Sequence, residues 1–350
     1  MKMKKIKLLL AATAAMVSLS ASAQGWTAQV PADGDFYLYN VGAGKFLSCG
    51  SENWGTKACI DNGALKFTLA DQGSGAYKLF TTSTFSYGNP NAAQLQSSGY
   101  VDQSVTATTW TFGEVDGLEN TYTLLNAAGT YLVAPSDGTK SILLNSDAPA
   151  NAYGYWKLIN KDNLFLNASE ENPADITCLI GDANFESNNG TMKGFWTMDA
   201  SNQNLCGGAI PNNCAESWRS SFTLSQELSV PNGKYQLTAQ AAVNEYTVTG
   251  ADMPYVYAND ATATFSTMTH GENSMTLVGN QFTAGEYVVG PIDVTVTNGT
   301  LTIGAKGTRT DTWCVFDNFQ LTYLGLDLSD LKNALQEQID AVADLEGTTT

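Results

Sequence analysis

A motif of one strand, an asparagine, a glycine-containing turn and a second short strand recurs in the first half of the chain. It is clearest at residues 36–48 and 122–133, and a weaker middle copy begins at Tyr77. Each unit also ends in a short aromatic strand. Three such units of about forty residues, each supplying aromatics to one shared core, predict a β-trefoil over residues 25–160. The aromatic end strands lie at residues 65–69, 110–112 and 155–158.

The first copy resembles the repeat of the ricin-type lectin trefoils. The resemblance rests on Asn40 followed by Gly44, Lys45, Phe46 and Leu47, and on the aromatic end strand. Those lectins usually close each repeat with Gln-x-Trp, and that glutamine is absent here. The resemblance therefore implies the trefoil fold more strongly than sugar binding by this domain. The aromatic positions that lack the glutamine are Phe67, Trp110 and Trp156.

Residues 174–325 show the alternation and turn signals of an antiparallel β-sandwich. Tyr235, Leu237, Ala239 and Ala241 fall on one face of a predicted strand, and Asn298 with Gly299 forms a strong hairpin signal. We expect two segments, residues 176–186 and 313–323, to be the strands that open and close the sandwich. The polar residues 161–173 are predicted to be a linker.

The two expected boundary strands resemble those of galactose-binding-type jelly rolls. The similar motifs are the Asn-Phe-Glu at residues 184–186 and the Phe-Asp-Asn-Phe at residues 316–319. Such jelly rolls occur as carbohydrate-binding modules in secreted polysaccharide-degrading and adhesive proteins of gut bacteria, Bacteroidetes among them. The resemblance also implies a structural calcium ion beside the first and last strands. Its ligands would be Glu186 and Asp317, with Asp182 and Asn184 as further candidates; the alternative is that these groups cap turns or face solvent.

A sugar-binding surface needs exposed aromatic rings beside amide, carboxylate or guanidinium groups. The polar stretch 307–312 delivers Trp313 next to Arg309 and Asp311, which makes Trp313 the leading candidate. The alternative for each aromatic is a place in the sandwich core. The further candidates for the surface are Trp218, Arg219, Trp196 and Tyr255.

The first 23 residues have the pattern of a secretory signal peptide. A basic start at residues 1–7 is followed by an apolar run over residues 8–19 and by small residues up to Ala23. Cleavage near Ala23 would remove four of the 17 Lys and Arg residues and none of the 34 Asp and Glu residues, so the net charge would change from −17 to −21. We therefore expect a secreted protein, extracellular, surface-associated or periplasmic, that neither inserts into a membrane nor binds nucleic acid.

Six cysteines in an exported chain make disulfide bonds plausible. Cys49 with Cys59 and Cys206 with Cys214 are the local pairs, which leaves Cys178 and Cys314. Free buried thiols are the alternative.

Helical spacing of apolar residues predicts an amphipathic helix over residues 327–346. No nucleophile motif accompanies His270, the only histidine, and no phosphate loop or dinucleotide fingerprint is present. We therefore expect an all-β, non-catalytic protein that binds a polysaccharide or host glycan. The alternatives are a structural or adhesive surface protein, and the accessory region of a glycoside hydrolase whose catalytic domain lies elsewhere.

Overall fold

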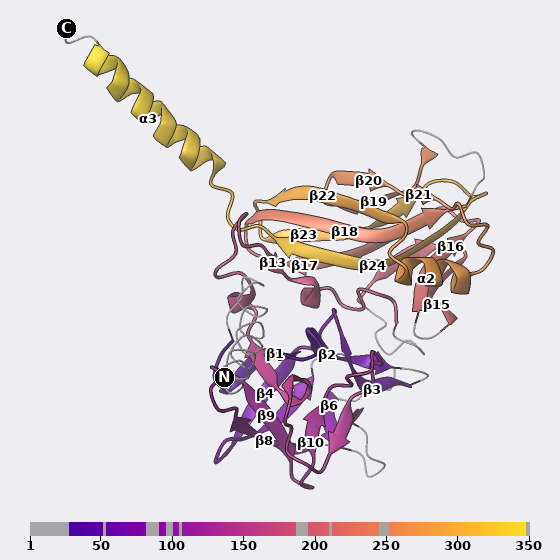
Figure 1. Cartoon of the computed structure of the whole chain (residues 1–350). Helices are drawn as coiled ribbons and strands as arrows, with labels where there is room; N and C mark the ends of the chain where they lie inside the picture. The colour runs from indigo at the N-terminus through magenta and orange to yellow at the C-terminus, as the bar shows by residue number, and fades with distance from the viewer. Residues whose placement is uncertain are drawn as a thin grey trace, which may run out of the picture.

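A computed structural model describes residues 28–51, 54–81, 91–95, 101–104, 107–186, 195–209, 212–244 and 252–347. The predicted signal peptide lies outside the described residues. The described chain is mostly β-structure: a first domain below, a two-sheet domain above it, and one helix, α3, at the C-terminal end (Figure 1). The predicted all-β class is confirmed.

Six strands of the first domain form a closed ring. Each pairs with the next in the order β1, β4, β5, β8, β9 and β12, and β12 pairs back to β1. Three hairpins, β2 with β3, β6 with β7 and β10 with β11, follow the first strand of each unit. This threefold pattern is a β-trefoil, as the repeats predicted. The bounds are β1 Gly34–Asn40, β2 Lys45–Ser51, β3 Trp54–Asp61, β4 Phe67–Gly73, β5 Ala76–Thr81, β6 Asn91–Leu95, β7 Val101–Ser104, β8 Thr109–Glu114, β9 Tyr122–Asn126, β10 Tyr131–Val133, β11 Leu143–Asn145 and β12 Trp156–Ile159.

Equivalent aromatic pairs explain why the repeat folds in this way. In each unit, an aromatic residue of the first strand lies directly opposite an aromatic residue of the fourth strand. All of these side chains are buried in one cluster. The closed ring thus gives each unit a place to bury the apolar surface that it could not cover alone. The pairs are Phe36 with Phe67, Tyr77 with Trp110, and Tyr122 with Trp156.

The second domain is a sandwich of two antiparallel sheets. One sheet has the order β15-β16-β24-β18-β21, with β13 beside β24 and β22 beside β18, and the other has the order β14-β17-β23-β19-β20. The parallel contact between β18 and β21 is the exception to the antiparallel pairing. The bounds are β13 Ala174–Asp175, β14 Thr197–Ala200, β15 Gln203–Ala209, β16 Asn212–Trp218, β17 Phe222–Ser229, β18 Gly233–Val243, β19 Tyr255–Ala258, β20 Ala261–Thr264, β21 Ser266–Thr267, β22 Val288–Val296, β23 Thr300–Gly307 and β24 Trp313–Tyr323.

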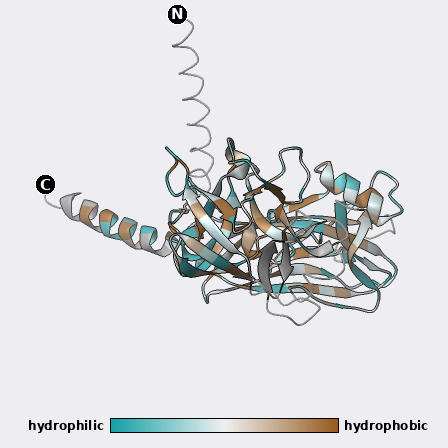
Figure 2. Ribbon diagram, turned by 90° about the horizontal axis from the view of Figure 1, so that it is seen from below, coloured by the Kyte–Doolittle hydropathy of each residue, from teal (hydrophilic) through white to brown (hydrophobic). Residues whose placement is uncertain are grey.

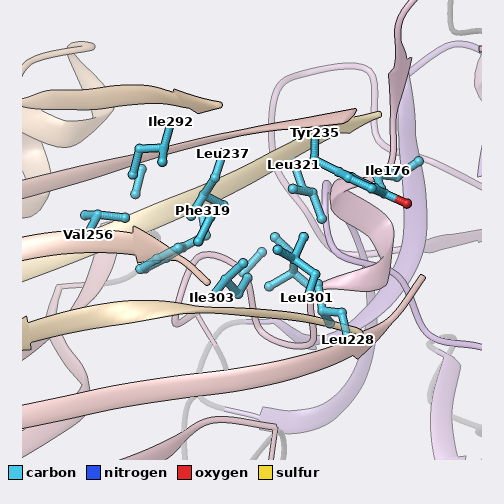
Figure 3. Packing of buried hydrophobic residues seen from close by; sticks show 14 of the residues in the cluster. Ile176, Leu228, Tyr235, Leu237, Val256, Ile292, Leu301, Ile303, Phe319 and Leu321 are labelled. Atoms are coloured by element: carbon cyan, nitrogen blue, oxygen red, sulfur yellow. The ribbon is translucent and has the colours of Figure 1, made fainter. Parts of the chain in front are cut away.

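The sandwich core forms between the two sheets. The alternation in β18 directs Tyr235 and Leu237 inward, where they meet Leu321 of β24 and Leu301 and Ile303 of β23 (Figure 3). The outer face of the first sheet is partly covered by helix α2, Met275–Thr283, which starts at the N-cap Ser274. The predicted sandwich is therefore present, with one short helix added to it.

The expected opening strand differs from the prediction. Only β13 is extended; residues 176–186 form the short 3-10 helix η3, Thr177–Leu179, and turns in which Asp182 and Phe185 have positive φ values of 51° and 47°. The segment nevertheless stays beside the closing strand, since the Ile176 N–H donates to the Leu321 carbonyl at 2.9 Å and the Phe319 N–H donates to the Ala183 carbonyl at 2.9 Å.

The two domains share apolar surface. Alternate residues of β1 face opposite ways: Phe36 and Leu38 enter the trefoil core, while Tyr37 and Tyr39 join the cluster that fills the sandwich. Residues 161–173, predicted as a linker, contribute to this junction, because they contain the 3-10 helix η2, Asp162–Leu164, and the buried Phe165. The domains thus pack against each other through side chains and not through a free linker.

Helix α3, Ser329–Gly347, confirms the predicted C-terminal helix. It extends away from the sandwich (Figure 1), and hydrophobic residues recur along it (Figure 2). Its apolar residues Leu335, Ile339 and Val342 are exposed. Among the described residues, no helix has both the length and the apolar composition that crossing a membrane requires.

The cysteines of the second domain are free thiols, so the expected pairs Cys178–Cys314 and Cys206–Cys214 are not formed. Cys178 and Cys314 are buried among apolar side chains. Burial raises the pKa of both Cys206 and Cys314 to about 12, so neither thiol is a ready nucleophile. The side chain of Cys49 lies outside the described residues, and no disulfide bond is present among the described residues.

Candidate functional site

At one end of the sandwich, several chain segments cross from one sheet to the other beside each other. The crossing from β16 to β17 runs next to the crossing from β23 to β24: Trp218 pairs with Trp313, the Arg219 N–H donates to the Thr312 carbonyl at 2.8 Å, and Phe222 pairs with Gly307. We call this end the crossover rim. It consists of residues 200–203, 218–222, 252–255 and 307–313.

Trp218 is the exposed aromatic side chain of the crossover rim. It ends β16, and 49% of its surface is accessible to solvent. The guanidinium carbon of Arg219 lies 5.3 Å from the centroid of the indole. Such a cation–π contact orients the ring without removing it from solvent. The rim therefore presents an aromatic plate with a cation beside it.

Arg309 and Asp311 supply the paired charges of the crossover rim. The Arg309 Nε donates to Asp311 Oδ1 at 2.8 Å, and Nη2 donates to the second carboxylate oxygen. Asp252 lies 3.9 Å from Nη1 of the same guanidinium. The hydrogen bonds from Arg309 lower the pKa of Asp311, so this exposed pair stays charged and fixed in orientation. The sequence predicted Arg309 for this surface but did not identify Asp252.

Trp313 does not lie on the exposed surface. Only 8% of it is accessible, because it packs with Met268, Val278 and Tyr287 under helix α2 and its neighbouring loop. Its indole N–H donates to Glu216 Oε2 at 2.7 Å. Trp313, the leading candidate from the sequence, thus donates its indole N–H inside the domain. Its ring is not exposed for stacking on a ligand.

The remaining aromatic candidates are also partly or fully covered. Trp196 is buried between Phe185 and Phe319, with ring centroids 5.4 and 4.9 Å away, and its N–H donates to the Asp182 carbonyl at 3.0 Å. Tyr255, at the start of β19, is half-buried. The rim therefore brings together Trp218, Arg219 and Arg309, with Tyr255 at its margin, and leaves Trp196 in the core.

The positions predicted to bind calcium lie instead at the junction of the two domains. There, Lys140 of the trefoil extends its ammonium to within 3.0 Å of Glu186 Oε1 and 3.7 Å of Asp61 Oδ2. The Asn184 side-chain amide donates to both oxygens of Asp61, at 2.9 and 2.8 Å. A trefoil ammonium and a trefoil carboxylate thus engage two of the four predicted ligands. No sequence signal marks Lys140 or Asp61, because their role depends on how the domains pack.

Two of the predicted calcium ligands have their polar groups engaged by other partners. Asn184 presents its N–H groups to Asp61, and the Asp182 carbonyl accepts the indole N–H of Trp196. In the described part of the chain, no group of three or more His, Cys, Asp and Glu side chains is placed to hold a metal ion. Calcium binding by these residues stays a prediction.

Burial changes the ionisation of the junction acids. Burial raises the pKa of Glu186 to about 7, even though Lys140 opposes the shift, because Asp61 shares the same ammonium. Burial also raises the pKa of Asp317 well above its usual range. Lys140 is itself buried, but the two carboxylates outweigh the burial and raise its pKa. The junction thus keeps the Lys140 ammonium charged, whereas burial favours the neutral forms of Glu186 and Asp317.

Comparisons with known proteins identify no family for this chain. No protein-family model and no curated protein matches the chain. Among solved structures, it is similar to SeviL bound to asialo-GM1 saccharide, with 19% identity over 37% of this chain and 99% of that chain and a TM-score of 0.29. It is also similar to the ricin B-like lectin of Macrolepiota procera in complex with lactose, with 14% identity over 38% and 99% and a TM-score of 0.30. TmCBM61 in complex with β-1,4-galactotriose gives 17% identity over 41% and 96% and a TM-score of 0.24. Similarities with TM-scores this low do not indicate a function for this chain.

Proposed function

We propose that this protein is an exported, non-catalytic glycan-binding protein whose binding surface is the crossover rim of the second domain. The observation that carries the proposal is the exposed indole of Trp218 beside the Arg219 guanidinium, on the same crossover rim as the oriented Arg309–Asp311 pair. A sugar ring offers an apolar C–H face and a rim of hydroxyl groups. The indole matches the face, and the charged pair matches the hydroxyl groups.

Trp218→Ala tests this proposal. We expect retardation of the protein in gels containing soluble polysaccharides, and binding on a glycan array, to weaken at least tenfold, or by about 1.4 kcal/mol. Trp218→Phe should retain part of the binding because it keeps a ring. Phe80→Ala is the matched control, since Phe80 is an exposed aromatic of the trefoil, at 39% accessible. Unchanged binding by the Trp218→Ala protein would refute the rim as the site.

Calcium stays a separate prediction. Glu186 and Asp317 are acids at the domain junction, and the Lys140 ammonium lies 3.0 Å from the Glu186 carboxylate. If calcium nevertheless binds there, a chelator will lower the melting temperature of the protein and excess calcium will restore it. An unchanged melting temperature would remove the ion from the proposal.

A further inference from the structure

A polar cleft of about 530 Å³ lies between the two domains, away from the crossover rim. The trefoil contributes Lys45, Asp61, Asn62 and the segment 138–140. The sandwich contributes the outer faces of β18 and β24 and the C-terminal end of α2. Clefts between domains are frequent ligand sites, because they present polar groups from two directions at once. We call this space the interdomain cleft.

Asp317 lines the interdomain cleft as a buried acid without a cation. Only 4% of the residue is accessible. Among the described residues, one hydrogen bond reaches its carboxylate, from the Asn318 N–H at 2.8 Å, and no Lys, Arg or His nitrogen lies within 4 Å of it. Withdrawing a carboxylate from water without a compensating charge is costly. Burial therefore favours the neutral form of Asp317, and an ammonium group brought by a ligand would supply the charge that stabilises its ionised form.

The neighbouring acids do not share this property. Asp61 and Glu186 both face Lys140, and Asp61 also accepts two hydrogen bonds from Asn184. Gln240, which lies opposite Asp317 on β18, accepts a hydrogen bond from the Asn318 side chain at 2.6 Å and donates to two carbonyls near the end of α2. Asp61 and Glu186 thus share one ammonium, whereas Asp317 has no ion pair among the described residues.

Amide and hydroxyl groups line part of the rest of the cleft, beside Lys45 and the apolar Ala239, Phe282 and Val288. Asn62 and Gln320 are exposed at its edge, and Thr238 lies on the neighbouring strand β18. Such groups both donate and accept hydrogen bonds, so they match the hydroxyl groups of a polyol. The chain as a whole has a net charge of −17, which raises the local concentration of cations.

We propose that the interdomain cleft binds an amino sugar, with the ammonium group paired with Asp317 and the ring hydroxyl groups bonded to the amides at the cleft edge. This site goes beyond the glycan-binding rim and does not depend on it. The two sites differ in chemistry: the rim offers an aromatic plate in solvent, whereas the cleft offers a buried acid.

Titration calorimetry on the full chain tests the proposal with D-glucosamine and D-galactosamine as probes. We expect both to bind, and we expect N-acetylglucosamine and glucose, which lack the ammonium, to bind at least tenfold more weakly. Asp317→Asn should weaken the binding of glucosamine at least tenfold, and Gln320→Ala should weaken it by a smaller factor. Asp311→Asn, which removes an acid of the crossover rim, is the matched control and should leave glucosamine binding unchanged.

Further outcomes separate this proposal from the rim. Trp218→Ala should leave glucosamine binding unchanged, so loss of polysaccharide binding in that protein would not affect the cleft. The proposal is overturned if N-acetylglucosamine binds as well as glucosamine, or if a folded Asp317→Asn protein binds glucosamine as the parent does. It is also overturned if calcium chloride binds at Asp317 while neither amine does. If Asp317→Asn does not fold, unchanged glucosamine binding by Gln320→Ala overturns it.

Discussion

The crossover rim and the interdomain cleft both involve strand β24, yet they differ in the chemistry that they present. At the rim, an indole and a guanidinium lie in solvent. At the cleft, four residues from Trp313, the carboxylate of Asp317 is withdrawn from solvent. The comparison shows that the strand itself does not decide what its residues do. What covers each residue decides it: helix α2 covers Trp313, and the packing of the trefoil against the sandwich encloses Asp317.

The largest expected effect concerns the paired indoles Trp218 and Trp313. Trp313→Ala should lower the free energy of unfolding by about 3–5 kcal/mol, because it leaves a cavity under α2 and removes the donor to Glu216. Trp218→Ala should change it by less than about 1 kcal/mol, since that ring is half exposed. Denaturation with urea measures both values. Equal losses of stability would contradict the division between a core indole and a surface indole.

The second prediction concerns the pH dependence of the domain junction. The pKa of Glu186 is about 7 in the folded chain, against an ordinary value of 4.5, so the native state holds a proton that the unfolded state has lost. Stability from this group is present below about pH 4.5 and is lost as the pH rises through 7, by about 3 kcal/mol in total. Thermal melts of the parent and of Glu186→Gln between pH 4 and 8 measure the effect.

The Glu186→Gln protein serves as its own control in that experiment. As the pH rises, other acids of this acidic chain also ionise and destabilise the folded state. The difference between the two proteins therefore isolates the contribution of Glu186. We expect the melting temperature of the parent to fall more steeply than that of Glu186→Gln between pH 5 and 7. Parallel curves would show that Lys140 keeps Glu186 ionised throughout.

The trefoil could be predicted because its sequence pattern occurs three times. Three copies of a strand, turn and aromatic end strand are visible in the sequence, and the structure closes them into a ring in which Phe67, Trp110 and Trp156 take equivalent places. Strand alternation likewise identified the core face of β18. These features are local, and each depends only on residues close together in the chain.

The role of Trp313 could not be predicted in the same way. Trp218 and Trp313 are directly paired, so their side chains share one face of the sheet. Residues 268–287 cover one ring and leave the other exposed, and no local pattern shows which ring they cover. The same holds for Glu186: its partner Lys140 lies in the other domain, and only the packing of the domains brings the two together.

The smallest expected effect concerns two buried indole N–H groups of the trefoil, one with a hydrogen-bond acceptor and one without. The indole N–H of Trp156 donates to the Leu132 carbonyl at 2.9 Å. The equivalent N–H of Trp110 has no acceptor among the described residues. Because both rings are buried, replacing each with Phe removes similar apolar contact. Trp156→Phe also removes a hydrogen bond and leaves a buried carbonyl with one donor fewer, whereas Trp110→Phe removes an unsatisfied donor.

We therefore expect Trp156→Phe to lower the free energy of unfolding by about 1 kcal/mol more than Trp110→Phe does. Urea denaturation of both proteins, with equal slopes against denaturant, measures this difference. Because the two positions are related by the threefold repeat, the loss of ring volume is matched between them, and each protein is the control for the other. Equal losses would indicate that the Trp110 N–H has an acceptor in solution, and the pairing of buried polar groups would then not distinguish the two units.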